Sequence, residues 1–142
     1  MGKTSLATNI AFNVASAYDA TQQVDSSARP TAGGIVAFFS LEMSSEQLAT
    51  RVISEQTEIP SSDIRRGDID ATAFGKLLEC RQKMRRLPLF IDQTGAVSIA
   101  QLAARACRLK RQRGLHLVIV DYIQLMQGKS PRAAQNRVQE IT

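Results

Sequence analysis

Residues 35–40 read Ile-Val-Ala-Phe-Phe-Ser, a short apolar run that follows the pair Gly33 and Gly34. A strand with one face in water alternates apolar and polar residues, whereas a continuous apolar run is typical of a strand covered on both faces. Strands of that kind belong to parallel sheets with helices on either side. Residues 35–40 therefore predict a buried strand in an α/β domain.

Helices are expected on both sides of this strand. Downstream, Ser44 or Ser45 is expected to cap a helix whose residues Leu48, Val52 and Ile53 face inward. Upstream, one helix is expected from Thr4 to about Ala20, because apolar residues recur there every four positions. The recurring residues are Leu6, Ile10, Val14 and Tyr18.

The rest of the chain continues the alternation of helices and strands. Ser98 and Gly114 are expected to open and close one further helix. The other expected elements are a connector with a short helical turn at 59–67, a helix at 71–86, strands at 89–91 and 117–121, and a last helix from about Asn136. This order predicts an α/β fold with a mainly parallel sheet, and one domain over residues 1–142 with an exposed loop at 21–34.

Two of these helices carry apolar residues at helical spacing, which predicts their inner faces. The helix at 71–86 is expected to bury Phe74, Leu77 and Leu78, with Cys80 and Met84 as further candidates. The helix after Ser98 is expected to bury Ile99, Leu102, Ala103, Ala106 and Leu109.

The formal net charge is +5, from 18 Lys and Arg against 13 Asp and Glu. Such a balance suits a polyanionic partner, but many soluble domains share it. Basic side chains crowd residues 81–86 and 105–113. We interpret both groups as solvated outer faces, because apolar residues fix the opposite helix faces inward. A DNA-binding surface at 105–113 and a ring-subunit contact at 81–86 are the alternatives.

The cysteines and the hydropathy exclude two further classes of protein. Cys80 and Cys107 match no paired metal-ligand spacing, and His116 has no companion for a zinc site, so we expect two reduced, buried thiols. Nothing in the sequence approaches the roughly 18 to 20 consecutive apolar residues that cross a bilayer. We therefore expect a cytoplasmic protein without a membrane partner.

Residues 1–4, Met-Gly-Lys-Thr, match the last half of the phosphate-binding loop G-x-x-x-x-G-K-S/T. In that loop the backbone N–H groups surround the phosphates, the lysine neutralises the β and γ oxygens, and the hydroxyl binds Mg²⁺ at a helix start. Gly2 and Lys3 stand where the first helix opens, as the motif requires. Because so short a motif is common by chance, it needs companions elsewhere in the chain.

Two carboxylates supply these companions. Asp121 ends the apolar strand 117–121, which is how a Walker B strand presents an aspartate to magnesium. Glu42 follows the strand 35–40, at the edge where ligands of open α/β sheets gather, and can there deprotonate an attacking water. The alternatives are an aspartate at a strand end with no function, and a glutamate that only favours the dipole of the next helix.

Four phrases of the sequence resemble the DnaB family of bacterial replicative DNA helicases. They are MGKTSLA at 1–7, FSLEMS at 39–44, DYIQLM at 121–126 and NRVQEI at 136–141. Because the phrases span nearly the whole chain, they favour this family over other RecA-like ATPases such as recombinases and clock ATPases.

The resemblance implies a RecA-like P-loop NTPase core that forms a ring of six around single-stranded DNA and uses ATP to unwind the replication fork. Primase and a helicase loader are implied as possible partners. By position, the resemblance assigns Gly2, Lys3, Thr4, Ser5, Arg51 and Gln124 to ATP, Thr4 and Asp121 to Mg²⁺, and Glu42 to the role of catalytic base.

Compared with that family, we expect the chain to lack the strand that leads into the phosphate loop, and also the later segment with the arginine finger. A buried strand without its neighbour leaves polar groups unpaired, at about 1 to 3 kcal/mol each. We therefore expect the isolated chain to be weakly folded, to bind ATP poorly and not to unwind DNA. The alternative is a non-catalytic interaction module. An in-frame phosphate loop upstream and an arginine-bearing segment downstream would favour the enzyme.

Overall fold

The structure is a computed structural model that describes residues 2–19 and 32–123. Within these ranges the strands β1 (Val36–Ser40), β2 (Leu89–Asp92) and β3 (Leu117–Asp121) form a parallel sheet in the order β2-β1-β3. The register pairs Val36 with Leu89 and with Leu117. The predicted parallel α/β sheet is confirmed, and the expected last helix near Asn136 lies outside the described residues.

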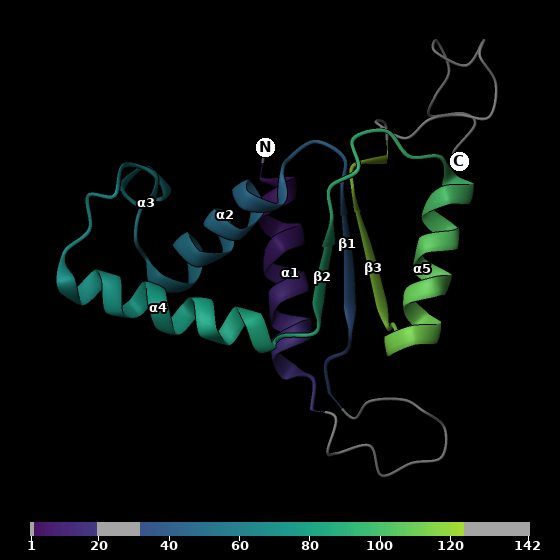
Figure 1. Cartoon of the computed structure of the whole chain (residues 1–142), viewed down its shortest axis with the longest axis horizontal. Helices are drawn as coiled ribbons and strands as arrows, with labels where there is room; N and C mark the ends of the chain where they lie inside the picture. Colours follow the sequence, from purple (N-terminus) through teal and green to yellow (C-terminus); the bar gives the residue numbers. More distant parts are fainter. Residues whose placement is uncertain (1, 20–31, 124–142) are drawn as a thin grey trace.

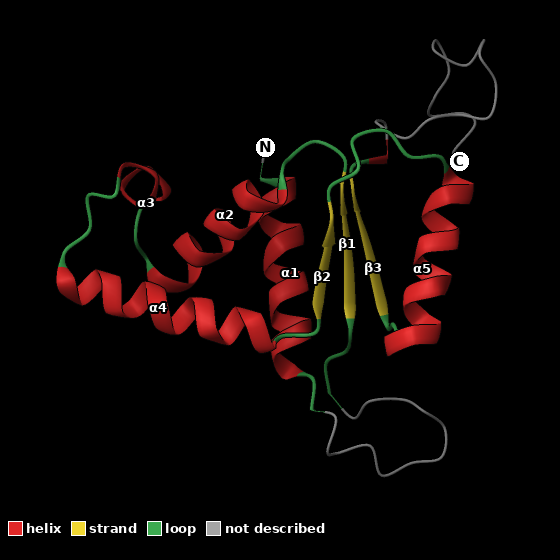
Figure 2. Ribbon diagram, viewed as in Figure 1, coloured by secondary structure: helices red, strands yellow, loops and turns green. Residues whose placement is uncertain are grey.

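Helices lie on both faces of the sheet, as Figures 1 and 2 show. Helix α1 (Lys3–Ala17) packs against all three strands on one face, and α2 (Ser45–Thr57) and α4 (Ala71–Arg86) lie beyond it. The short α3 (Ser61–Arg66) joins α2 to α4, and α5 (Ile99–Arg113) covers the other face. The sheet is therefore a middle layer between two layers of helix.

Strand β1 is the centre of the core. All its residues are buried, and Val36 and Phe38 form one cluster with Ala11, Ala15 and Leu48. Full burial of a side chain such as Phe38 stabilises the fold by about 1.5–3 kcal/mol. The prediction of a strand covered on both faces is confirmed.

Two helices begin with the serine caps that the sequence predicts. Ser44 accepts a hydrogen bond from the N–H of Gln47, and Ser98 accepts one from the N–H of Gln101. In both cases the glutamine side chain bonds back to the serine N–H, which completes a capping box. Such a cap stabilises a helix by about 1 kcal/mol, so the two serines fix where α2 and α5 begin.

The predicted first helix is present as α1, but the stripe of apolar residues that recurs every four positions is not its buried face. Leu6 is 63% exposed and Ile10 is also exposed, whereas Thr8, Ala11, Phe12 and Ala15 are buried. A strict spacing of four drifts by about 40° per step around a helix of 3.6 residues per turn. The buried set follows the helical period more closely, and its alanines let the helix approach the sheet.

The inner faces of α4 and α5 also differ from the prediction. Phe74 is 56% exposed and Leu78 is exposed, while Cys80 is buried, because α4 packs on α2 rather than on the sheet. In α5 no residue is fully buried, Ile99 and Ala103 are exposed, and Leu102, Ala106 and Leu109 are half-buried. Cys107 is also exposed, contrary to the expectation of a buried thiol.

The exposed loop expected at 21–34 falls mostly outside the described residues, and its last residue is buried. Gly34 donates its N–H to the carbonyl of Val14, near the end of α1. Gly33 has φ +65°, and a Cβ there would meet backbone atoms of Val14 and Tyr18 at 2.4 Å. This close approach requires glycine, so the chain enters β1 in contact with α1. No helix in the described ranges is long and apolar enough to cross a membrane.

Candidate nucleotide site

The carboxyl ends of β1 and β3 meet at one edge of the sheet. Ser40 pairs with Asp121, and the N–H of Leu41 donates a 2.8 Å hydrogen bond to the carbonyl of Asp121. The first turn of α1 lies at the same edge (Figure 1). Two strand ends and one helix N-terminus therefore converge where open α/β sheets bind their ligands.

The first turn of α1 and the end of β3 are in direct contact. Oγ1 of Thr4 donates a 2.8 Å hydrogen bond to Oδ2 of Asp121, and Asp121 is only 4% exposed. The sequence predicted both residues as magnesium ligands from opposite ends of the chain. The structure brings these two oxygen donors together, and their role as ligands stays a prediction.

Gly2 opens α1 in a conformation suited to an anion. It is the N-cap at φ +87°, a left-handed conformation that favours glycine, and no side chain caps the helix. The first turn holds no acidic residue. Unpaired N–H groups and the positive end of the helix dipole favour a bound phosphate, so the first turn fits the role predicted for Gly2, Lys3 and Ser5.

Arg51 reaches this helix start from α2. Its Nη1 donates a 3.3 Å hydrogen bond to Oγ of Ser5, so two predicted nucleotide contacts touch each other. Burial raises the pKa of the neighbouring Glu55 carboxyl, and the positive charge of Arg51 partly offsets that rise. A guanidinium beside the first turn of α1 adds positive charge where a phosphate would lie.

Glu42 lies two positions beyond the end of β1, in an exposed bend at the same edge. The hydroxyl of Ser40 shapes this bend, since it donates to the carbonyl of Met43 at 2.6 Å and accepts from the N–H of Met43 at 3.2 Å. Ser40 is buried and was not predicted as a site residue. A serine that ends a strand and precedes a turn is the signal that points to it.

Three predicted site residues, Lys3, Glu42 and Gln124, are not placed by side-chain contacts in the described part of the chain. Within residues 2–19 and 32–123, the side chains of Lys3 and Glu42 make no hydrogen bond and no ion pair. Lys3 stands at the start of α1 and is exposed. Gln124 lies outside the described residues. For Lys3 and Glu42, placement at the sheet edge therefore follows from the backbone.

The end of β2 adds a polar cluster to this edge that the sequence did not predict. Arg105 of α5 donates to both carboxylate oxygens of Asp92, at 3.1 and 2.9 Å, and to the hydroxyl of Thr94. Partial burial acts to raise the pKa of the Asp92 carboxyl, but the hydrogen bonds from Thr94 and the Arg105 charge outweigh it and hold that pKa below its ordinary value.

This cluster corrects the interpretation of the basic residues on α5. Arg105 turns toward the sheet and forms an ion pair, so it does not belong to a solvated outer face. The guanidinium of Arg113 lies 5.5 Å from the centre of the Phe90 ring. Arg108, Lys110 and Arg111 are exposed, as expected.

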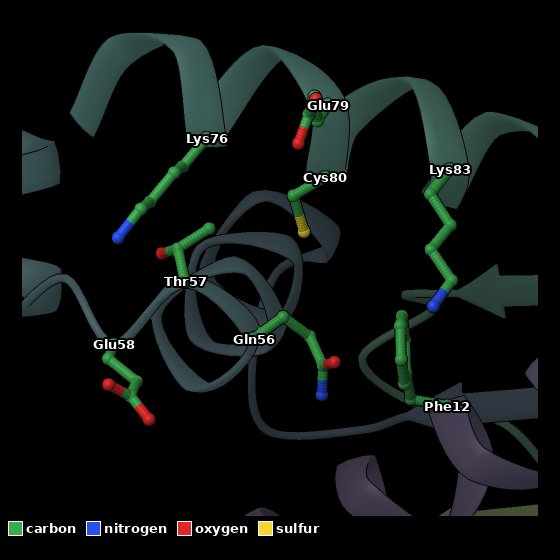
Figure 3. Close-up of a pocket in the computed structure, with 8 residues that line it drawn as sticks. All are labelled: Phe12, Gln56, Thr57, Glu58, Lys76, Glu79, Cys80 and Lys83. Atoms are coloured by element: carbon green, nitrogen blue, oxygen red, sulfur yellow. The ribbon is translucent and has the colours of Figure 1, made fainter. Parts of the chain in front are cut away.

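Two hollows of about 340 Å³ lie near α2, and only one adjoins the predicted residues. That one is lined by Met43, Glu46, Arg51 and Arg65, among others, beside the first turns of α2. The second, in Figure 3, lies between α2 and α4, where Cys80 points from α4 toward α2 and the ammonium of Lys83 lies 5.4 Å from the centre of the Phe12 ring.

The oxygen donors at the sheet edge fit a magnesium ion held mainly by a nucleotide. Mg²⁺ in phosphate-transfer sites takes one or two protein oxygens and completes its shell with water and phosphate oxygens. Thr4 and Asp121 offer one hydroxyl and one carboxylate within hydrogen-bond distance of each other. Among the described residues, no cluster of three or more His, Cys, Asp or Glu forms a protein-only metal site.

A model of one protein family matches the entire chain. The family is described as the DnaB-like helicase C terminal domain, and the match covers residues 1–142. A curated relative, the replicative DNA helicase DnaB of Rickettsia felis, is 39% identical over 142 residues. The match takes in 100% of this chain and 28% of the relative, so the chain spans little more than a quarter of the relative's length.

Two solved structures share the fold of the chain. One, an ATPase domain, is 23% identical with a TM-score of 0.68, and the match covers 75% of this chain and 39% of that one. The other, a DnaB-like replicative helicase studied with its primase interactions, is 24% identical with a TM-score of 0.66, covering 75% of this chain and 26% of that one. These likenesses confirm the fold class expected from the sequence.

Proposed function

The chain belongs to the DnaB-like helicase C-terminal domain family, and from that membership we propose that it is the ATP-hydrolysing core of a replicative DNA helicase. The observation that carries the proposal is the hydrogen bond between Thr4 and Asp121. It joins the end of a Gly-Lys-Thr motif to the buried carboxylate that ends β3, which is the pairing that a Walker A and Walker B magnesium site needs. We assign residues 1–142 to one ATPase domain.

Each proposed site residue at the sheet edge has a separate role in ATP hydrolysis. The N–H groups after Gly2 and the ammonium of Lys3 neutralise the phosphate oxygens, with Ser5 and Arg51 beside them. Thr4 and Asp121 hold Mg²⁺, which when bound neutralises charge on the β and γ phosphates. Glu42 accepts a proton from the water that attacks the γ-phosphorus, while the bond from that phosphorus to the β–γ bridging oxygen breaks and ADP leaves. Gln124 is assigned to the same nucleotide by family resemblance.

The assembly and partners of the chain follow from the same proposal. We assign it to a homo-hexameric ring around single-stranded DNA at the replication fork, in the cytoplasm. One solved relative is a DnaB-like replicative helicase described together with its primase interactions, which supports primase as a partner. A helicase loader is a further proposed partner. Each of these assignments concerns the whole protein rather than the sheet edge alone.

Hydrolysis of ATP by the full gene product, with Lys3→Ala and Glu42→Gln variants, tests the proposal. Lys3→Ala should weaken binding of a fluorescent ATP analogue about tenfold or more, because it removes the charge that faces the phosphates. Glu42→Gln should retain binding and lower kcat about 100-fold or more, as expected for loss of a general base. Equal nucleotide binding by the unsubstituted protein and Lys3→Ala would favour a non-catalytic interaction module instead.

A further inference from the structure

We propose that Gln93 is a positioning residue for Glu42, and that the cluster of Asp92, Thr94 and Arg105 holds Gln93 in place. The proposal rests on the function proposed above, since it takes Glu42 as the catalytic base. It extends the site from β1 and β3 to the end of β2 and to α5, on the other face of the sheet.

Gln93 makes a contact that spans the sheet edge. Its Oε1 accepts a 2.6 Å hydrogen bond from the backbone N–H of Ser45, which is 48 positions away and is the first residue of α2. The first N–H groups of a helix have no partner inside the helix, so they depend on acceptors from outside. The hydroxyl oxygen of the cap Ser44 accepts the N–H of Gln47, and the N–H of Ser45 donates to Gln93 instead.

The contact with Gln93 is the last of three that hold the backbone of residues 41–45, the segment that carries Glu42. At its start, the N–H of Leu41 bonds to the carbonyl of Asp121. In its middle, the hydroxyl of Ser40 bonds to both backbone groups of Met43. At its end, Gln93 holds Ser45. Because the carboxylate of Glu42 has no hydrogen-bond partner of its own in the described part of the chain, the backbone on both sides sets its position.

The neighbours of Gln93 fix its own backbone. Oδ1 of Asp92 accepts the N–H of Thr94 at 3.0 Å and the Thr94 hydroxyl at 2.7 Å, which closes a turn with Gln93 at its centre. Arg105 donates to both oxygens of the same carboxylate, at 3.1 and 2.9 Å. Asp92 pairs with Phe39 in the sheet, so the turn is set against β1, the strand that leads to Glu42. Gln93 thus lies between a fixed turn and the start of α2.

The matched pair Gln93→Ala and Gln93→Glu in the full gene product tests this positioning role. Gln93→Ala removes the acceptor, whereas Gln93→Glu keeps an oxygen that can accept the N–H of Ser45. We expect Gln93→Ala to lower kcat for ATP hydrolysis about tenfold with little change in KM, because the base is displaced while the phosphate contacts remain. We expect Gln93→Glu to restore most of the rate. Equal kcat in Gln93→Ala and the unsubstituted protein would overturn the proposal.

Amide hydrogen exchange separates this proposal from the proposed function. In Gln93→Ala, exchange should accelerate at residues 41–45 and stay unchanged in β1 and α1, with the melting temperature preserved. Unchanged exchange at 41–45 overturns the positioning role even if the unsubstituted protein hydrolyses no ATP. A different outcome is faster exchange at 41–45 in Gln93→Ala together with an ATP hydrolysis rate that Glu42→Gln does not change. That outcome would support the contact of Gln93 with Ser45 and would overturn Glu42 as the base.

Discussion

Thr4 and Asp121 lie 117 positions apart in the sequence, yet Oγ1 of Thr4 donates a 2.8 Å hydrogen bond to Oδ2 of Asp121. The bond joins the first turn of α1 to the end of β3 through a carboxylate that is almost fully buried. The same two oxygens are the proposed magnesium ligands. Stability and metal dependence of the chain should therefore respond to the same substitution.

Replacement of Thr4 by valine should cost about 1 to 3 kcal/mol of unfolding free energy, because Asp121 loses a hydrogen-bond donor and stays buried. The matched variant Thr4→Ser keeps the hydroxyl and should lose much less. Urea unfolding followed by circular dichroism measures both. Under the proposed function, only Thr4→Val should also raise the magnesium concentration needed for nucleotide binding. Identical unfolding midpoints for Thr4→Val and Thr4→Ser would show that the hydrogen bond contributes nothing.

Replacement of Arg51 by methionine should act on Ser5 and Glu55 together. The variant loses the hydrogen bond to Ser5, so binding of a fluorescent ATP analogue should weaken severalfold. It also removes the charge that opposes the effect of burial on Glu55, so the pKa of that carboxyl should rise further. Nuclear magnetic resonance titration of Glu55 measures the second effect, with Arg51→Lys as the charge-preserving control. A Glu55 pKa that falls in Arg51→Met would contradict this account.

The ion pair of Asp92 with Arg105 should stabilise the fold at neutral pH and not in acid. Because the pKa of Asp92 is lowered in the folded state from 3.8, the unfolded chain binds more protons in the window around and below that value. The stabilisation is present above about pH 4 and is lost as the pH falls through the folded pKa. Both side chains are a third or more exposed, at 34% and 41%, so the effect should stay under about 1 kcal/mol.

The Asp92→Asn variant measures this contribution. Its unfolding free energy should lie below that of the unsubstituted protein at about pH 6, and the difference should shrink at about pH 3. A difference that grows toward acid pH would mean that the folded state prefers the protonated carboxyl, contrary to the geometry.

The two thiols should react with a disulfide reagent at very different rates. Cys107 is exposed, whereas Cys80 is buried against α2, and burial raises the pKa of the Cys80 thiol despite the opposing charge of Lys83. Thiolate is the reactive form, so at about pH 8 one thiol per chain should react quickly and the second only slowly. The variant Cys107→Ser should lose the fast phase and keep the slow one. Two equally fast thiols would mean that α4 does not stay packed on α2.

Local sequence patterns predicted the elements better than their faces. The apolar run at 35–40 and the serines at 44 and 98 specify a strand and two helix starts by short-range rules, and the structure agrees. The buried face of a helix depends on the element on which it packs, and the sequence of the helix alone does not identify that element. Phe74 is therefore exposed where apolar spacing predicted a core residue.

In the candidate site, too, the sequence identified residues with a chemical signature but not the long-range contacts between elements. The motifs located Thr4 and Asp121, and the family resemblance located Ser5 and Arg51. The structure places these four residues in two touching pairs. Gln93 was missed, because a glutamine in a turn has no chemical signature. Its contact with Ser45 depends on the parallel alignment of β1 and β2, which pairs Phe39 with Asp92. Long-range register of this kind cannot be read from either strand alone.

The alignment of Ser40 with Asp121 also links the assembly of the site to correct folding. Successive side chains of a strand point to opposite faces, so a slip of β3 by one residue would turn Asp121 away from α1 and break its bond to Thr4. Such a chain would keep its helices and its hydrogen-bonded sheet but would have no paired oxygens for a metal. A ligand that binds only the aligned form would shift the equilibrium from misaligned to aligned molecules. Nucleotide and magnesium would therefore favour the correct pairing of β3 with β1.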